Sequence, residues 1–148
     1  MNITVTGIGY VGLSNALLLA QSNQVIALDI SLDKISKLDR GISPILDKEI
    51  QDFLKNKKLN FKVTLDKEIA YQNADFVVIS TPTNYDEEAN FFDTRTVESV
   101  IKDVKSINPS SIIVIKSAIN WQGCDQLVKA FITGTEECLA RVDNVSCL

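Results

Sequence analysis

The feature that most constrains this chain is a set of three glycines close to its amino terminus. Gly7, Gly9 and Gly12 follow the spacing G-x-G-x-x-G, directly after the short stretch 2–6 in which polar and apolar residues alternate. The apolar run 13–20 that comes next has the length of a helix. The pattern therefore predicts a strand, a tight glycine turn and a helix, in that order.

This order of elements is typical of a dinucleotide-binding turn. The first glycine allows the tight turn, the second lets the backbone approach a pyrophosphate, and the third lets helix and strand pack closely. The phosphates would lie on unpaired N–H groups at the positive end of the helix. Asp29 ends the second apolar run, where this pattern has a carboxylate that binds the adenosine ribose. The alternative is a structural glycine turn that binds nothing.

Two side chains after the second predicted strand bear on the choice of cofactor. The carboxylate of Asp29 would repel a 2′-phosphate, so the sequence favours NAD over NADP. Lys34, one turn into the next predicted helix, has two interpretations. Its ammonium group pairs with a cofactor phosphate, or it is a solvated side chain on the helix surface.

Strand and helix patterns alternate along the rest of the chain. Helices are expected over 32–39, 47–55 and 66–72, and from Thr94 or Thr96 through Val104, and strands over 25–29, 61–65, 76–79 and 112–115. The last two strands are continuously apolar, which is typical of parallel strands covered on both faces. We therefore expect an α/β fold with a Rossmann-like doubly wound, mostly parallel sheet and helices on both faces.

Polar residues follow the strand predicted at 76–79. The segment Ser80-Thr-Pro-Thr-Asn-Tyr85 comes directly after it. Ligands gather beyond the carboxyl ends of the strands in an open parallel sheet, so these hydroxyls would lie where a cofactor passes. The alternative is a polar loop with a helix cap. The acidic stretch 86–93 is expected to be a surface connection, because its carboxylates lack the ordered pattern of a metal site.

The composition argues against several classes of function. Fifteen basic and nineteen acidic residues give a net charge of −4 without a basic cluster, so nucleic acid is not an expected partner. The chain has no histidine, and its three cysteines lack the spacing of a zinc site, so no metal is expected. With no apolar run of membrane-spanning length and no signal peptide, we expect no membrane partner and a cytoplasmic location.

Six motifs in the chain occur together in one known family, in the same order and at the same spacing. They are Gly7-Ile-Gly-Tyr-Val-Gly-Leu-Ser14, Ala27-Leu-Asp-Ile30, Ile42-Ser-Pro-Ile45, Ser80-Thr-Pro-Thr-Asn-Tyr-Asp86, Val97-Glu-Ser-Val-Ile-Lys-Asp-Val104 and Val114-Ile-Lys-Ser117. Across about four fifths of the chain, they resemble the amino-terminal part of the UDP-glucose 6-dehydrogenases, within the UDP-glucose/GDP-mannose dehydrogenase family.

The resemblance implies an oxidoreductase of nucleotide-sugar metabolism. Such an enzyme oxidises the C6 alcohol of UDP-glucose to the carboxylate of UDP-glucuronate and reduces two NAD⁺ to NADH. Carried over residue by residue, the cofactor-binding set is Gly7, Gly9, Tyr10, Val11 and Gly12 at the pyrophosphate, Asp29 at the adenosine ribose, Lys34 nearby and Thr83 against the NAD. The family homodimer forms largely through a later region, so dimerisation is not expected to transfer.

The resemblance stops after Ser117. The family continues with a threonine, a branched residue and a proline, whereas this chain continues Ala118-Ile-Asn120. The family's glutamate, lysine, asparagine and cysteine of the reaction site have no counterpart, and Cys124 does not match the nucleophile motif, so no catalytic residue is assigned. We expect an incomplete NAD-binding domain over 1–117 and a divergent tail over 118–148, from a shifted reading frame or a foreign fusion. The alternative is a divergent but functional terminal segment.

The sequence leaves several functions in competition. The chain is a truncated UDP-glucose 6-dehydrogenase that is inactive alone, a non-catalytic module that binds NAD or ADP-ribose, or a remnant of an interrupted gene whose unpaired sheet edge aggregates. Another Rossmann NAD-dependent dehydrogenase is the enzymatic alternative. UDP-glucose would be a partner only if the missing sugar domain were present.

Overall fold

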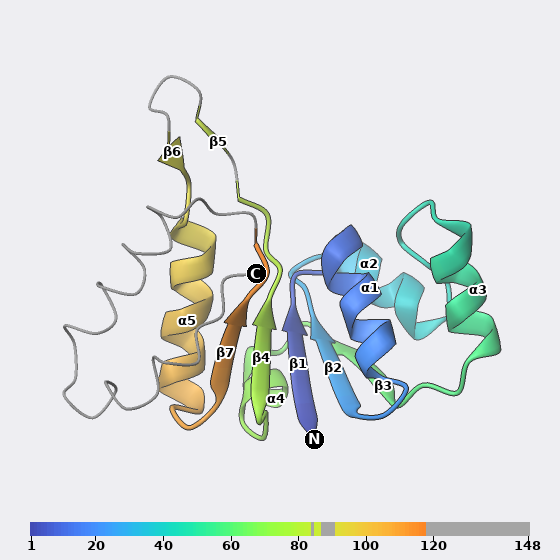
Figure 1. The fold of residues 1–148 in the computed structure, drawn as a ribbon, viewed down its shortest axis with the longest axis horizontal. Coiled ribbons are helices and arrows are strands. Elements are labelled where there is room, and N and C mark those ends of the chain that lie inside the picture. The colour runs from blue at the N-terminus through green and yellow to red at the C-terminus, as the bar shows by residue number, and fades with distance from the viewer. Residues whose placement is uncertain (84, 87–90, 118–148) are drawn as a thin grey trace.

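In the computed structural model, which describes residues 1–83, 85–86 and 91–117, five strands form one parallel sheet (Figure 1). The strands are β1 (Asn2–Thr6), β2 (Gln24–Leu28), β3 (Phe61–Thr64), β4 (Phe76–Ile79) and β7 (Ile112–Ile115). Their order in the sheet is β3-β2-β1-β4-β7, and every neighbouring pair is parallel. The predicted α/β architecture is confirmed.

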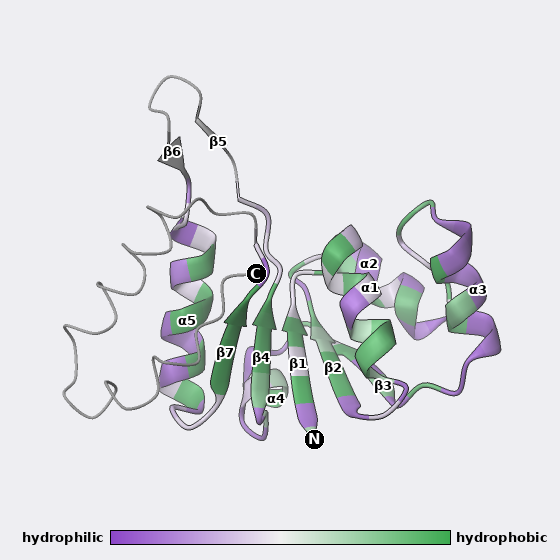
Figure 2. Cartoon of the chain, viewed as in Figure 1, coloured by the Kyte–Doolittle hydropathy of each residue, from purple (hydrophilic) through white to green (hydrophobic). Residues whose placement is uncertain are grey.

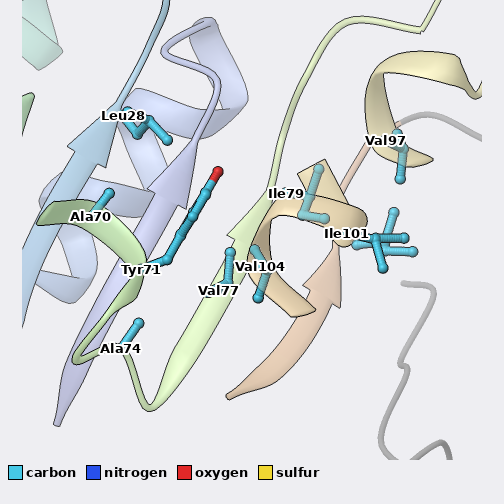
Figure 3. Close-up of a cluster of buried hydrophobic side chains, with 10 residues drawn as sticks. Leu28, Ala70, Tyr71, Ala74, Val77, Ile79, Val97, Ile101 and Val104 are labelled. Atoms are coloured by element: carbon cyan, nitrogen blue, oxygen red, sulfur yellow. The ribbon is translucent and has the colours of Figure 1, made fainter. Parts of the chain in front are cut away.

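The helices divide between the two faces of this sheet. They are α1 (Tyr10–Leu19), α2 (Leu32–Asp39), α3 (Lys48–Asn56), α4 (Lys67–Tyr71) and α5 (Arg95–Ile107). Leu13, Leu38 and Ile50, from α1, α2 and α3, belong to one buried cluster. Tyr71 and Ile101, from α4 and α5, belong to another cluster (Figure 3). The chain thus winds outward from β1 in one direction through β3, then returns to the other side of β1 and winds outward through β7.

Local sequence signals explain where several of the helices begin and end. The Asp47 carboxylate accepts a hydrogen bond from Ile50 N at 2.9 Å, and the Asp66 carboxylate accepts one from Glu68 N at 2.8 Å. Such N-caps contribute about 1 kcal/mol each to helix stability. After α2 the chain passes through Gly41, whose φ of +71° lies in the left-handed region that favours glycine. These boundaries lie within one residue of the predicted ones.

Strands β4 and β7 are both apolar along their length (Figure 2), but they differ in how far they are buried. In β4 the last three residues are all buried, as expected for a strand covered on both faces. In β7 only Ile115 is buried, while 112–114 are partly exposed. The expectation of a fully buried strand is therefore wrong for β7, because it is an edge strand among the residues that the structure describes.

The acidic stretch contains more secondary structure than the sequence predicts. Two-residue strands β5 (Tyr85–Asp86) and β6 (Phe91–Phe92) pair in antiparallel orientation. Strands this short are not predictable from alternation, because a pattern of period two needs more residues to show itself. Asn84 and the segments 87–90 and 118–148, with the predicted tail, lie outside the described residues. None of the described helices is long and apolar enough to cross a membrane.

Candidate functional site

The turn between β1 and α1 can be built only with glycine at two of its positions. Gly7 has a φ of +93°, which side-chain-bearing residues rarely adopt. A Cβ atom on Gly7 would lie 2.7 Å from the backbone oxygen of Ser80, and one on Gly12 would lie 1.9 Å from the backbone oxygen of Gly7. Both distances are far below any normal contact. The glycines therefore let the turn, helix α1 and the end of β4 approach one another closely.

The middle glycine has the opposite surroundings. A Cβ atom on Gly9 would meet no other atom within 4 Å, so the backbone there faces open space. Gly9 is the N-cap of α1, and its carbonyl accepts the hydrogen bond of Leu13 N at 2.9 Å. The N–H groups of Tyr10, Val11 and Gly12 precede that bond and have no acceptor within the helix. No acidic side chain lies in this first turn, so the helix end is free to attract an anion.

The Asp29 carboxylate is held against the glycine turn. Only 8% of the residue is exposed. Its Oδ2 accepts a hydrogen bond from Ile8 N at 2.7 Å, and its Oδ1 accepts one from Ser31 N at 2.9 Å. Bonds from backbone N–H groups to an ionised carboxylate are among the stronger ones in proteins. The acid predicted to bind a ribose is therefore fixed in place at the carboxyl end of β2, beside the turn.

Lys34 is the third group that contacts this carboxylate. Its Nζ lies 3.1 Å from Asp29 Oδ2, and 37% of its side chain is exposed. The two interpretations drawn from the sequence placed this ammonium group on a phosphate or in solvent, and neither included the ion pair with Asp29. Among the described residues Oδ1 has one donor, and a carboxylate oxygen can accept two hydrogen bonds. Oδ1 thus keeps acceptor capacity for a further hydroxyl while Lys34 stays on Oδ2.

The loop after β4 is tied to its neighbours at the same edge of the sheet. Ser80 N donates to Thr6 O at 2.8 Å, and Ser117 Oγ donates to Thr81 O at 2.8 Å. Thr96 Oγ1 donates to Pro82 O at 3.0 Å. Thr83, predicted to lie against NAD, is partly buried in this loop, on the opposite side of β1 from β2 and Asp29. The candidate residues therefore lie on both sides of the glycine turn, with Asp29 on the β2 side and Thr83 on the β4 side.

One group at this site was not identified from the sequence. It is the amide of Ile8, which orients Asp29, and a backbone partner leaves no signal in the residue pattern. The hydroxyl of Ser80 was expected near a cofactor from its place directly after β4. Its burial was not expected: the oxygen is buried with no hydrogen-bond partner in the described part of the chain. Within the described residues, no group of three or more His, Cys, Asp or Glu side chains could hold a metal ion.

Two cavities at the other end of the sheet do not belong to this site. One, of about 320 Å³, is lined by residues that include Asn2, Gln24 and Asn73. The other, of about 670 Å³, is lined by residues that include Met1 and Lys58. Both lie where strands begin, whereas ligands of open parallel sheets bind where strands end. The glycine turn and Asp29 therefore define the candidate site.

Comparison with known proteins identifies the family to which this site corresponds. Residues 1–147 match the family model described as the UDP-glucose/GDP-mannose dehydrogenase family, NAD binding domain. The chain is 47% identical over 121 residues to UDP-glucose 6-dehydrogenase of Campylobacter jejuni, covering 80% of this chain and 31% of that protein. It is 44% identical over 119 residues to that of Streptococcus pneumoniae, covering 80% and 30%. The chain thus spans about a third of the length of these relatives.

Solved structures agree on the fold. The GDP-mannose dehydrogenase of Pseudomonas aeruginosa, determined as a ternary complex, has a TM-score of 0.77 at 23% identity, covering 95% of this chain and 33% of that one. The UDP-D-ManNAc dehydrogenase of Pyrococcus horikoshii also has a TM-score of 0.77, at 24% identity, covering 90% and 32%. The family match extends into residues 118–148, so the boundary predicted at residue 117 stays a prediction.

Proposed function

The chain belongs to the UDP-glucose/GDP-mannose dehydrogenase family and matches its NAD-binding domain, and we propose that it forms the cofactor-binding part of a UDP-glucose 6-dehydrogenase. The observation that carries this proposal is the 2.7 Å hydrogen bond from Ile8 N to Asp29 Oδ2. It sets a carboxylate beside a glycine turn whose helix N-terminus is open to an anion. A diphosphate and the ribose next to it present that combination of groups.

Each part of the turn has a proposed role in holding NAD. The N–H groups at the start of α1 bind the pyrophosphate, in the open space that Gly9 faces. The cofactor-binding residues are Gly7, Gly9, Tyr10, Val11 and Gly12 for the pyrophosphate, Asp29 for the adenosine ribose, Lys34 beside it, and Thr83 on the far side of the turn. The amino end of α1 carries about half a positive charge, which complements the diphosphate.

The proposed chemistry belongs to the bound cofactor. NAD, when bound, accepts a hydride from the alcohol carbon of the sugar. The residues of this chain bind and orient the dinucleotide, and none of the described ones is proposed as catalytic. The fixed Asp29 carboxylate accepts hydrogen bonds from ribose hydroxyls and repels a 2′-phosphate, so NAD is proposed in preference to NADP.

Tested on its own, the 148-residue chain is proposed to bind NAD without oxidising UDP-glucose. Holding the sugar in line with the cofactor can lower the barrier by about 7–11 kcal/mol. The chain spans about a third of its relatives, so the 148 residues carry only part of what such alignment requires. UDP-glucose binding, the homodimer of the family and the cytoplasmic location stay predictions.

Calorimetric titration with NAD, NADP and ADP-ribose tests the proposed function. We expect NAD and ADP-ribose to bind, NADP to bind at least about tenfold more weakly, and Asp29→Ala to weaken NAD binding at least about tenfold. Asp33→Ala, which removes an exposed carboxylate from α2, is the matched control and should bind NAD normally. No heat of binding with NAD or ADP-ribose, or an Asp29→Ala variant that binds NAD as the unaltered chain does, would refute the proposal.

A further inference from the structure

One buried polar atom beside the glycine turn has no partner. The hydroxyl oxygen of Ser80 is buried and makes no hydrogen bond to any group in the described residues. Buried hydroxyls are nearly always hydrogen-bonded, because an unpaired one loses its bonds to water without replacing them. A group of this kind requires an explanation in terms of what the site does.

Ser80 lies where the cofactor's diphosphate would bind. It is the first residue after β4, and its backbone N donates to Thr6 O at 2.8 Å, next to the turn. A Cβ atom on Gly12 would lie 3.2 Å from the Ser80 Cβ, so the serine side chain contacts the first turn of α1. The same turn presents the unpaired N–H groups of Tyr10 and Val11. Asp29 lies across the turn from Ser80, at the end of β2.

The side chain can turn toward that position. Ser80 as a residue is partly exposed although its hydroxyl oxygen is buried. A serine has three staggered positions for this oxygen, and moving between them is a rotation about one bond. Such a rotation would take the oxygen out of its buried position without moving the backbone.

We propose that the Ser80 hydroxyl rotates on cofactor binding and donates a hydrogen bond to the pyrophosphate of the dinucleotide, an inference that rests on the proposed NAD site. The bound state satisfies an oxygen that the unliganded chain leaves unpaired. The ligand class is a dinucleoside or nucleoside diphosphate, and the phosphate oxygens are the acceptors. The contact adds a side-chain donor on the β4 side of the turn to the backbone donors of α1.

This arrangement predicts opposite effects of one substitution on stability and on binding. Ser80→Ala removes the unpaired oxygen, so its melting temperature should be equal to or above that of the unaltered chain. It also removes a hydrogen bond to a charged phosphate, so NAD affinity should fall at least about tenfold. Ser111→Ala is the matched control, because it removes a serine hydroxyl that does have a partner, Asn108 O at 3.0 Å, at the amino end of β7 and so at the opposite end of the strands from Ser80. It should melt lower and bind NAD normally.

The experiment titrates the full chain, Ser80→Ala, Ser111→Ala and Asp29→Ala with NAD and with ADP-ribose, and melts each protein without ligand. Equal losses of affinity for NAD and ADP-ribose in Ser80→Ala, together with an unreduced melting temperature, are the expected result. Adenosine, which has no phosphate, should bind Ser80→Ala and the unaltered chain equally.

Four results would overturn the inference. An unchanged affinity of Ser80→Ala for NAD would show that the Ser80 hydroxyl does not bind the pyrophosphate. If Asp29→Ala has lost NAD binding in the same series, the proposed NAD site still stands. A loss for NAD without a loss for ADP-ribose assigns the hydroxyl to the nicotinamide half. A lowered melting temperature of Ser80→Ala shows that the oxygen is satisfied in the unliganded chain. An unaltered chain that binds neither ligand refutes this inference and the NAD site together.

Discussion

Replacing Gly12 with alanine tests how closely the glycine turn and helix α1 approach each other. The added Cβ would lie 1.9 Å from the backbone oxygen of Gly7, more than 1 Å inside any contact that real Cβ atoms show. Relief requires moving backbone, because no flexible side chain separates the two groups. Overpacking of this kind costs about 1–3 kcal/mol, and a backbone clash belongs at or above the upper limit.

The net effect follows from two opposing contributions. Alanine is a better helix former than glycine and returns about 1 kcal/mol. We therefore expect Gly12→Ala to lose at least about 2 kcal/mol of unfolding free energy, which is a fall of about 4–8 °C in melting temperature for a domain of this size. Urea unfolding followed by circular dichroism measures the free energy, and calorimetric titration with NAD measures the effect on the site. The displaced turn should bind NAD at least about tenfold more weakly.

Gly9→Ala is the matched variant, in which we expect little loss of stability but a loss of NAD binding. Its Cβ meets nothing within 4 Å, so its loss of stability should stay within about 1 kcal/mol, the cost of a poorer N-cap. The same Cβ enters the space proposed for the pyrophosphate, so NAD binding should still be lost. A Gly12→Ala variant that unfolds at the same urea concentration as the unaltered chain would refute the close approach. So would a Gly9→Ala variant that is the less stable of the two.

Two further predictions concern the α4 side of the sheet. Burial raises the pKa of Tyr71 to about 12, although the hydrogen bond with Thr6 acts in the opposite direction. The stability that the neutral phenol provides should therefore be lost as the pH rises from about 10 to about 12. The urea midpoint should fall across that range and should fall less steeply in Tyr71→Phe, whereas equal falls in the two proteins would contradict the assignment. The Asn108 amide donates to Tyr71 O and to Ala74 O, both at 2.9 Å. Asn108→Ala should therefore lose about 2–3 kcal/mol of unfolding free energy. An unchanged urea midpoint would show that these carbonyls find other donors.

Helices and strands whose ends are set by neighbouring residues were predicted correctly from the sequence. Helix α2 spans 32–39 as predicted, since Ser31 and Gly41 are strong local signals for its two ends. The partial exposure of β7 was not predictable, because it depends on which strands lie beside it in the sheet. An apolar run looks the same at the centre of a sheet and at its edge.

The candidate site likewise has features that the local sequence predicts and features that depend on the three-dimensional arrangement. The glycine spacing and Asp29 were identified from the sequence, because the spacing itself carries the geometric requirement. The partners of Asp29 were not, since Ile8 N is a backbone group and the Lys34 ion pair depends on how α2 is oriented. The unpaired Ser80 oxygen also needed coordinates, because burial of a single atom is not encoded by residue type.

The three donors around Asp29 have a consequence for the kinetics of binding. Ile8 N, Ser31 N and Lys34 Nζ already restrain the carboxylate without a ligand, so little conformational entropy remains to be lost there on association. A preorganised acid of this kind behaves as a rigid receptor: the adenosine end of a dinucleotide should dock in a single kinetic step. Slower rearrangement, if the cofactor induces any, then belongs to the opposite side of the turn.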